Sequence, residues 1–567
     1  MYSKRLINAA SGREPCDIVL KNCRVLNVFT GEIIDGDIGI AEGRIAGIGE
    51  YKGKEEKDLE GRYVVPGFIN SHVHVESSMV TPQVYSVEEL RHGTSTIITD
   101  PHEIVNVGGA DALIDILNAA DECPVNYYIM LPSCVPCTEF EHSGAVLDAR
   151  QLRLFMNEPE VLGLGEMMNA EGVINNDRTV SEKIKEFSGM IIDGHAPMYS
   201  GKKLNAYACA GINTDHESVT FDEALEKLRC GIAVLVREGS ACKDLEAIIK
   251  GVVESGIDTS ALAFCTDDKH LADIRREGTI RSNIKKAISL GLEPAKAFQM
   301  ATINAARIYG LKDTGAVACG YKADIVVLDS LEDVEIADVY KDGVQFKNIT
   351  EPEIKEKKMM RYNTGLMHSV NPAPLADDAF DIPEREIYPV IELVKNQIIT
   401  KKLIMTHEQI TENLKNGSVR KIAVIERHHS TGNCACAYIT GYGLSHGAVA
   451  TTVAHDSHNI IVIGDNDSDM HKAVEQLKKI NGGYTIICDG KVAGSLPLEF
   501  GGLMSTRSAD EFIPMLDDII KKAYELGVDK DIDPFITLSF AALPVIPEIR
   551  ITDRGLFDVT DFRFIEE

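Results

Sequence analysis

The stretch from residue 67 to 312 repeats one unit, a short apolar run followed by a segment with helical spacing of apolar residues. The helical segments include FDEALEKLRC (221–230) and DLEAIIKGVVESG (244–256), with apolar residues at i, i+3 and i+4. The apolar runs are typical of buried strands and lie at 63–70, 94–100, 125–131, 161–167, 189–195, 212–216, 232–238 and 261–268. Strands that alternate with helices over roughly 250 residues predict a parallel, TIM-like (β/α)8 barrel.

Two Gly-punctuated segments rich in Ile and Val flank this repeat, at 17–66 and 313–347. Such composition is typical of short strands joined by turns. DIVLKN (17–22) also has a close counterpart in DIVVLD (324–329). We therefore expect the two flanks to be halves of one small β domain into which the barrel is inserted.

The chain changes character again after about residue 385. Apolar runs at 421–427, 459–465 and 484–490 look like strands, and a Pro- and Asp-rich stretch at 371–384 is typical of a linker. A chain of 567 residues is long enough for three or four domains. The expected domains are a composite β-sandwich (1–66 with 313–370), the barrel (67–312) and a C-terminal α/β domain (385–567).

Charge and cysteine content narrow the partners and the compartment. The net charge of −29 disfavours nucleic-acid and anionic-membrane partners, because phosphate binding needs a basic surface. We find no apolar run of about 18 residues that would predict a membrane span, and the opening MYSKRLINAASGREPCD lacks a signal-peptide core. Thirteen scattered cysteines fit a reducing cytoplasm better than a disulfide framework. We expect a cytoplasmic protein.

Ionisable residues follow the predicted strands one after another. In a barrel of this kind, chemistry lies at the carboxyl ends of the strands. These strand ends carry His72 and His74, Asp100, His102 and Glu103, Glu166, His195, His216, and Asp267 with Asp268.

A single histidine there is more often a satisfied strand-end imidazole than a ligand. His72 and His74 are two residues apart and share one face of a strand, so a pair of metal ligands is as plausible as two strand-end imidazoles without a ligand role. The whole set at successive strand ends favours a metal site, because imidazole and carboxylate together suit Zn, Mn or Fe. A set this large could hold two ions bridged by a carboxylate and a hydroxide. Asp268 is the weaker half of its pair, and we expect a helix cap or a supporting group.

The motifs PGFINSHVHVESS, GHAP, TDH and TDD, in this order, resemble the amidohydrolase superfamily. Within it the chain is similar to the bacterial adenine deaminases, through TDPHEI, GLGEMM, QMATINAARIYGL and a C-terminal AHDSHNIIV. Many superfamily members bridge their metals with a carboxylated lysine, whereas this chain has Glu166 at that strand end, as adenine deaminases do.

The resemblance implies a role for each matching residue. His72 and His74 would bind one ion, Glu166 would bridge, His195 and His216 would bind the second, and Asp267 would bind metal and move the proton of the nucleophile. Mn or Fe are the expected ions and Zn is an alternative. The implied reaction is hydrolysis of adenine to hypoxanthine and ammonia, in an enzyme that is commonly a homo-oligomer.

The remaining groups receive less specific expectations. A carboxylic acid should protonate the purine ring, with Glu103 the first candidate and Glu76 the second; Glu76 could instead orient an imidazole. Asp100, His102 and Glu103 are expected on the substrate side or next to the metals.

Four alternatives stay open. His74-Val-Glu76 and Cys134-x-x-Cys137 resemble the zinc deaminases of nucleic acids, but Ser133 replaces their proline and the other histidines are then unexplained. The rival reactions are those of an amino-sugar deacetylase or a cyclic-amide hydrolase, and the rival class is an inactive assembly subunit. In AHDSHN, we expect His455 and His458 to form a structural turn; the alternative is a loop that closes the barrel mouth.

Overall fold

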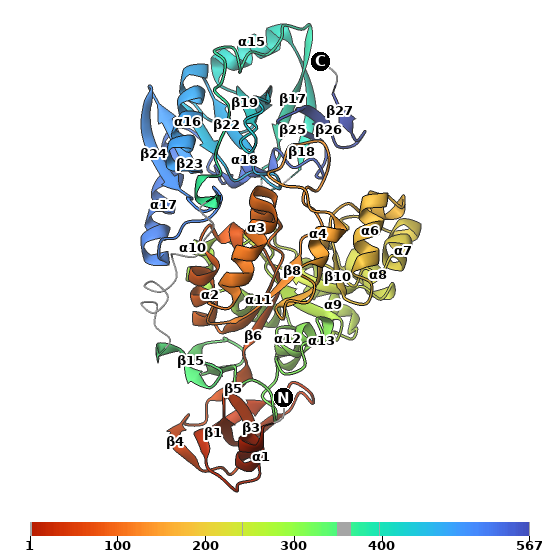
Figure 1. Ribbon diagram of the computed structural model, residues 1–567, viewed down its shortest axis with the longest axis vertical. Coiled ribbons are helices and arrows are strands. Elements are labelled where there is room, and N and C mark those ends of the chain that lie inside the picture. Colours follow the sequence, from red (N-terminus) through yellow and green to blue (C-terminus); the bar gives the residue numbers. More distant parts are fainter. Residues whose placement is uncertain (1–2, 241, 349–364, 396, 398, 566–567) are drawn as a thin grey trace.

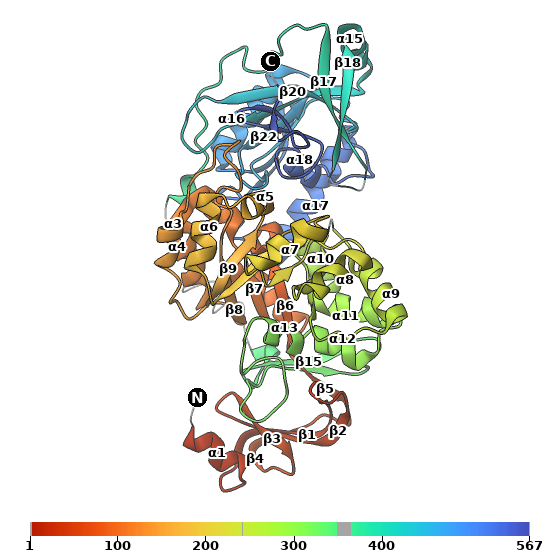
Figure 2. The ribbon, with the colours of Figure 1, turned by 90° about the vertical axis from the view of Figure 1, so that its right-hand side faces the viewer.

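The computed structural model describes residues 3–240, 242–348, 365–395, 397 and 399–565. Three bodies follow one another along the long axis: a small β domain, a barrel and a C-terminal domain (Figures 1 and 2). The chain leaves the small domain to form the barrel and returns to it afterwards, and the barrel lies between the two other bodies in both views. Among the described residues, no helix has the length and hydropathy needed to cross a membrane.

Strands from both flanks of the barrel form one sheet in the small domain, with α1 (Lys4–Ala10) beside it. β5 pairs antiparallel with β14, with Val64 opposite Val327, so the chain leaves and re-enters the sheet on neighbouring strands. DIVLKN lies in β1 and DIVVLD in β14. The strands are β1 (Cys16–Leu26), β2 (Ile33–Ala41), β3 (Arg44–Gly49), β4 (Gly53–Asp58), β5 (Tyr63–Pro66), β14 (Ile325–Leu328), β15 (Ile336–Lys341) and β16 (Val344–Gln345).

Eight parallel strands surround the barrel axis in two hydrogen-bonded groups, β10-β9-β8-β7-β6 and β11-β12-β13. Backbone hydrogen bonds connect the groups at both seams: Asp267 N donates to His72 O at 3.1 Å, and Asn213 N donates to Ile192 O at 2.8 Å. The strands are β6 (Phe68–Val73), β7 (Thr94–Thr99), β8 (Asn126–Leu131), β9 (Val161–Met167), β10 (Ile191–Gly194), β11 (Thr214–Asp215), β12 (Ala233–Arg237) and β13 (Leu262–Cys265).

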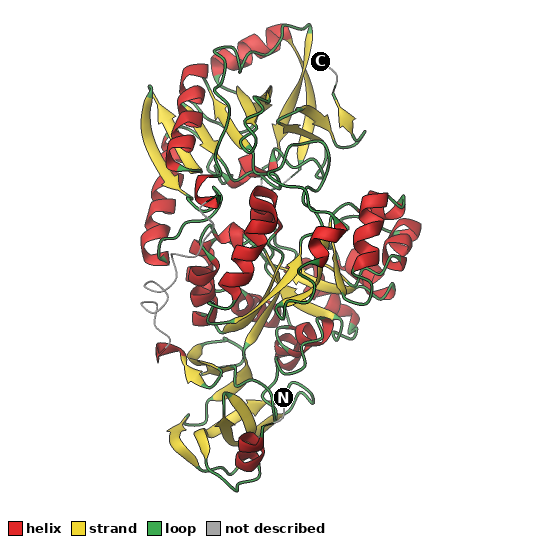
Figure 3. Cartoon of the chain, in the orientation of Figure 1, coloured by secondary structure: helices red, strands yellow, loops and turns green. Residues whose placement is uncertain are grey.

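Helices cover the outside of the barrel (Figure 3). Their ends match the local sequence: Thr220 accepts a hydrogen bond from Glu223 N at the start of α8, and Gly256 adopts the left-handed conformation after α9. The helices are α2 (Pro82–Arg91), α3 (His102–Ala120), α4 (Ala149–Arg153), α5 (Ala170–Ile174), α6 (Arg178–Glu186), α7 (Gly201–Cys209), α8 (Phe221–Arg229), α9 (Leu245–Ser255), α10 (Leu271–Glu277), α11 (Ile280–Ser289), α12 (Pro294–Met300) and α13 (Ile303–Ile308).

The C-terminal domain has a mixed sheet in the order β18-β17-β20-β19-β22-β21-β23-β24, and a separate three-stranded sheet, β25-β26-β27. The strands of the large sheet are β17 (Ile387–Leu393), β18 (Thr400–Thr406), β19 (Val419–Ile425), β20 (Cys434–Thr440), β21 (Ala448–Thr451), β22 (Ile460–Gly464), β23 (Gly483–Cys488) and β24 (Lys491–Pro497). The other elements are α15 (His407–Asn416), α16 (Asp467–Ile480), α17 (Ala509–Glu525), α18 (Ile536–Phe540), β25 (Ile549–Thr552), β26 (Gly555–Asp558) and β27 (Arg563–Phe564).

The stretch expected as a linker, 371–384, packs against this domain instead of spanning open space. Phe380 is fully buried in a cluster that contains Ala423, Ile425 and Val462. An aromatic side chain buries a large apolar area, and this outweighs the turn-forming composition around it.

The loop after β8 attaches the barrel to the C-terminal domain. Phe140 contacts Phe557 and Phe562, with ring centroids 4.6 and 5.0 Å away. The His142 backbone N donates to Asp553 Oδ1 at 3.0 Å, and Asn459 Nδ2 donates to the His142 carbonyl at 2.8 Å. The two domains therefore share an apolar and hydrogen-bonded interface beside the barrel mouth.

Candidate metal centre

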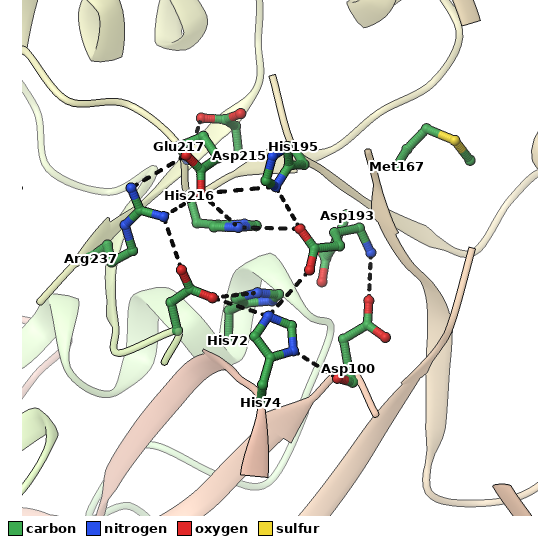
Figure 4. A network of polar contacts seen from close by, with 12 residues as sticks. His72, His74, Asp100, Met167, Asp193, His195, Asp215, His216, Glu217 and Arg237 are labelled. Carbon is green, nitrogen blue, oxygen red and sulfur yellow. Dashed lines mark hydrogen bonds and ion pairs between the residues drawn. The ribbon is translucent and has the colours of Figure 1, made fainter. Parts of the chain in front are cut away.

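Six residues predicted from the strand ends converge at the carboxyl-terminal mouth of the barrel (Figure 4). Five have buried side chains, and His195 is partly exposed. They come from β6 and the turn after it, from β9, and from the ends of β10, β11 and β13: His72, His74, Glu166, His195, His216 and Asp267.

Glu166 faces different histidines with its two oxygens. Oε1 lies 3.2 Å from His74 Nε2, whereas Oε2 lies 2.7 Å from His195 Nδ1 and 3.4 Å from His216 Nε2. On the first side, Asp267 Oδ1 lies 3.0 Å from His74 Nε2 and 3.7 Å from His72 Nε2. The carboxylate of Glu166 therefore stands between two groups of nitrogen and oxygen donors.

Several of these atoms have no hydrogen-bond partner within the described part of the chain, although they are buried. They include both ring nitrogens of His72 and Nδ1 of His216. An unpaired buried polar atom costs about 1–3 kcal/mol, so such a cluster is unfavourable without a ligand. Burial and neighbouring His72 hold the pKa of His216 well below its usual value, which keeps its imidazole neutral and able to bind metal. This donor set fits divalent metal ions.

Asp100 contacts two residues of the candidate metal centre. Its Oδ2 accepts a hydrogen bond from Glu166 N at 2.8 Å, and its carbonyl oxygen lies 2.9 Å from His74 Nδ1. A Cβ at Gly165 would lie 2.1 Å from Asp100 Oδ2, so this approach requires glycine. Asp100 therefore lies next to the candidate metal centre and holds His74 and Glu166 in place.

Asp215 supports the opposite side. It accepts a hydrogen bond from Ala196 N at 2.9 Å and forms a fully buried ion pair with Lys227, with Nζ 2.6 Å from Oδ2. Tyr207 OH accepts from His195 N at 2.9 Å and donates to Met167 O at 2.8 Å. The two histidines on this side are therefore held through the backbone next to them.

Arg237 is the main residue that the sequence reasoning missed. It lies at the end of β12, and its Nη1 donates to Asp267 Oδ2 at 2.9 Å and to Glu217. Its Nε donates to Asp244 Oδ2 at 2.9 Å. Burial raises the pKa of Asp267, but the neighbouring imidazoles of His72, His74 and His216 and the charge of Arg237 hold it well below its usual value. The available signal was a charged residue at the end of the apolar run IAVLVRE.

His102 and Glu103 start α3, next to the six residues of the candidate metal centre. His102 Nδ1 lies 3.4 Å from Glu166 Oε1, and its Nε2 lies 3.4 Å from Glu103 Oε1. Glu103 in turn bonds both histidines of AHDSHN: Oε1 meets His455 Nδ1 and Oε2 meets His458 Nε2. Residues 455–457 form the expected turn, and the contacts with Glu103 also place this turn over the barrel mouth. Spacing along the chain cannot reveal which distant residue a loop will face.

Glu76 occupies a different environment. Its Oε1 accepts a hydrogen bond from Ile104 N at 3.1 Å, while its Oε2 is buried and has no partner among the described residues. Burial raises the pKa of Glu76 to about 7. Asp268 caps no helix; its Oδ1 accepts a hydrogen bond from Ser77 Oγ.

A cleft lies between the barrel and the C-terminal domain, and we call it the interdomain cleft. Its barrel side includes Glu76, Glu103 and Asp268, and its C-terminal side includes His455, Tyr484 and Phe540.

Cys134 and Cys137 are free, buried thiols, and burial raises the pKa of Cys134 to about 12. A buried thiol with a raised pKa is a poor nucleophile.

Comparison with known families gives two matches along the chain. Residues 63–346 match the amidohydrolase family, and residues 397–563 match the adenine deaminase C-terminal domain. Among solved structures, one titled as the crystal structure of an adenine deaminase has a TM-score of 0.45 and 16% identity, covering 58% of this chain and 99% of that one.

Curated relatives span the full length. An adenine deaminase of Desulfitobacterium hafniense is 44% identical over 566 residues, covering 99% of this chain and 98% of the relative. Adenine deaminase 2 of Carboxydothermus hydrogenoformans is 44% identical over 569 residues, covering 99% of both chains. An adenine deaminase of Clostridium acetobutylicum is also 44% identical, covering 99% of both chains.

Proposed function

The chain belongs to the adenine deaminase family of amidohydrolases, and from this premise we propose that it hydrolyses adenine to hypoxanthine and ammonia. In this reaction a C6–O bond forms and the C6–N6 bond breaks. The observation that carries the proposal is the set of unpaired, buried donors around Glu166 at the barrel mouth. Full-length similarity to adenine deaminases, including the C-terminal domain, supports adenine as the substrate.

We propose that six residues hold two divalent ions. His72 and His74 would hold one ion and His195 and His216 the other, with Glu166 between them and Asp267 as a further ligand. The opposite orientation of the two Glu166 oxygens supports this division. When bound, such ions supply a hydroxide nucleophile at neutral pH, because they lower the pKa of bound water to about 7. Mn or Fe are the expected ions, and Zn suits the same donors.

Asp267 is the proposed proton carrier. Arg237 donates to its Oδ2, so Oδ1 is the oxygen that faces the histidines. From there Asp267 takes the proton of the nucleophile and passes it to N6, which leaves as ammonia. Arg237 keeps the carboxylate ionised and oriented for this transfer.

Protonation at N1, the ring nitrogen next to C6, keeps negative charge from building up during attack. Of the two carboxyl groups expected for this task, the contacts favour Glu76. Both oxygens of Glu103 are bonded by histidines, whereas Oε2 of Glu76 is unpaired and the residue lines the interdomain cleft.

The experiment is to follow ammonia release, together with the ultraviolet shift from adenine to hypoxanthine, on protein purified with added Mn. We expect rapid turnover of adenine and none of adenosine. Inactivity on adenine in protein that holds metal would refute the proposal. An amino-sugar deacetylase would instead release acetate, and an inactive assembly subunit would purify nearly free of metal.

We also propose that the protein is a cytoplasmic homo-oligomer without nucleic-acid or membrane partners. The net charge of −29 supports the lack of nucleic-acid and membrane partners, and thirteen free thiols support a reducing compartment. The oligomeric state rests on the family resemblance. Light scattering coupled to gel filtration would measure the oligomeric state.

A further inference from the structure

The interdomain cleft combines flat aromatic rings with ionisable groups from both domains. Phe540 stacks against His455, with ring centroids 4.8 Å apart and an interplanar angle of 22°. Tyr484, also on the cleft wall, stacks against Phe535 at 4.0 Å and 2°. Such rings provide a surface for another flat heterocycle, and the nearby polar groups can fix its orientation.

Glu103, His455 and His458 bring three potential metal-binding atoms together, but the hydrogen bonds indicate a different arrangement. Ala454 N donates to His458 Nδ1 at 3.0 Å, so this nitrogen carries a lone pair. In a neutral imidazole the proton then lies on Nε2, which donates to Glu103. His458 Nε2 therefore has no lone pair for a metal ion, and the three residues form a hydrogen-bonded cluster.

His455 differs from His458 in having one ring nitrogen left over. Nδ1 is used by Glu103, and Nε2 has no hydrogen-bond partner in the part of the chain that the structure describes. The contacts with Glu103 and Phe540 fix the ring, so Nε2 has a defined direction within the cleft wall. Although burial lowers it, the adjacent Glu103 carboxylate raises the pKa of His455 to about 9. The imidazolium form carries a proton on both nitrogens.

We propose that His455, supplied by the C-terminal domain, contacts the substrate and donates a hydrogen bond from Nε2 to a ring nitrogen of the purine. This inference rests on the proposed function. Glu103 and His458 are positioning residues, because they hold His455 and the loop around it but face each other rather than the substrate. N3 and N7 are the acceptors available, since N1 is protonated by Glu76 in the proposed reaction. The C-terminal domain is thus part of the substrate site.

Two matched variants test this assignment. His455→Asn keeps an amide NH near the position of Nδ1 and can still bond Glu103, but it removes Nε2. His458→Gln keeps an NH near the position of Nε2 and can also bond Glu103. We expect kcat/KM for adenine to fall about 10- to 100-fold in His455→Asn, as for loss of a hydrogen bond from a charged donor. A smaller loss is expected in His458→Gln, with wild-type metal content in both.

Competitive inhibition by 3-deazaadenine and 7-deazaadenine separates a substrate contact from a structural role. Each analogue lacks one candidate acceptor, so the wild-type enzyme should bind one of them about tenfold or more weakly than the other. The difference should vanish in His455→Asn and persist in His458→Gln.

Three results would overturn the inference: equal binding of both analogues by the wild type, an unchanged ratio in His455→Asn, or loss of metal in that variant. The wild-type measurement decides even if the variant does not fold. An active wild-type enzyme with any of these results refutes the inference alone. A wild-type enzyme inactive on adenine refutes the proposed function as well.

Discussion

Asp267 is proposed both as a metal ligand and as the proton carrier. Asparagine in its place keeps the shape and one oxygen but cannot accept a proton. We therefore expect Asp267→Asn to lower kcat for adenine about 100- to 10,000-fold, the range for loss of a general acid or base. Metal analysis should show largely unchanged content, because His72, His74, Glu166, His195 and His216 remain. Full activity would exclude Asp267 as the proton carrier.

His92, at the end of α2, gives the folded chain a pH dependence remote from the metal centre. It is buried, its Nε2 has no partner among the described residues, and burial lowers its pKa from 6.5 to about 4. The unfolded chain thus binds this proton more readily, so stability is complete above pH 6.5 and is lost as the pH falls towards 4. The shift corresponds to about 3 kcal/mol.

The check is urea unfolding of wild type and His92→Gln between pH 4 and 8. The free energy of unfolding should fall less steeply in the variant between pH 6.5 and 4, by up to about 3 kcal/mol. Parallel pH curves would show that His92 contributes nothing to acid sensitivity.

For single residues, the sequence predicted which ionisable side chains follow a strand. It did not predict which other residues these side chains would contact. His72, His195 and Asp267 could be placed at strand ends because the runs before them are distinct. The contact between Arg237 and Asp267 joins the ends of different strands. The contact between Glu103 and His455 joins two domains, and these residues are 352 positions apart in the chain. Such contacts depend on packing that spacing along the chain does not contain.

Among the elements, the loop after β8 is one of the links between the barrel and the C-terminal domain. Phe140 lies within an aromatic group formed by Phe557, Phe562 and Phe564. We expect Phe140→Ala to cost about 2 kcal/mol of stability, less than for a fully buried ring because Phe140 is only half-buried. Calorimetry should show one unfolding transition in the wild type and a broadened or split one in the variant.

Phe29→Ala is a suitable control, because Phe29 is 44% exposed and lies on the small β domain. Phe29→Ala should change the free energy of unfolding by no more than about 0.5 kcal/mol. A single sharp transition in Phe140→Ala, at the wild-type midpoint, would mean that other contacts couple the domains.

Strand positions followed the sequence closely where a run was long and apolar, as in β7, β8 and β9. The pattern was less accurate for INTDH, expected as a strand over 212–216, where β11 is only Thr214–Asp215. His216 lies directly after this short strand and faces the candidate metal centre, so the requirement of the site overrides the periodicity.

Across the whole molecule, the proposed metal ligands lie at both seams of the barrel. His72 and Asp267 lie at one seam, and His195 and His216 lie at the other. We expect a chelator to lower the midpoint temperature of thermal unfolding by several degrees. An ion whose free concentration is 1,000 times its Kd stabilises the folded chain by about 4 kcal/mol, and the chelator removes this contribution. Restoring Mn should reverse the change. An unchanged midpoint after proven metal loss would contradict a stabilising role.

The sheet shared by both flanks has a consequence for synthesis on the ribosome. β5 ends at Pro66 and its partner β14 begins at Ile325, so 325 − 66 = 259 positions separate them. At about 5–20 residues per second, the growing chain waits roughly 13–50 s before that edge can pair. During this delay the early strands present an open edge to other nascent chains. The barrel must emerge, and can begin to fold, before the domain at its own start is complete.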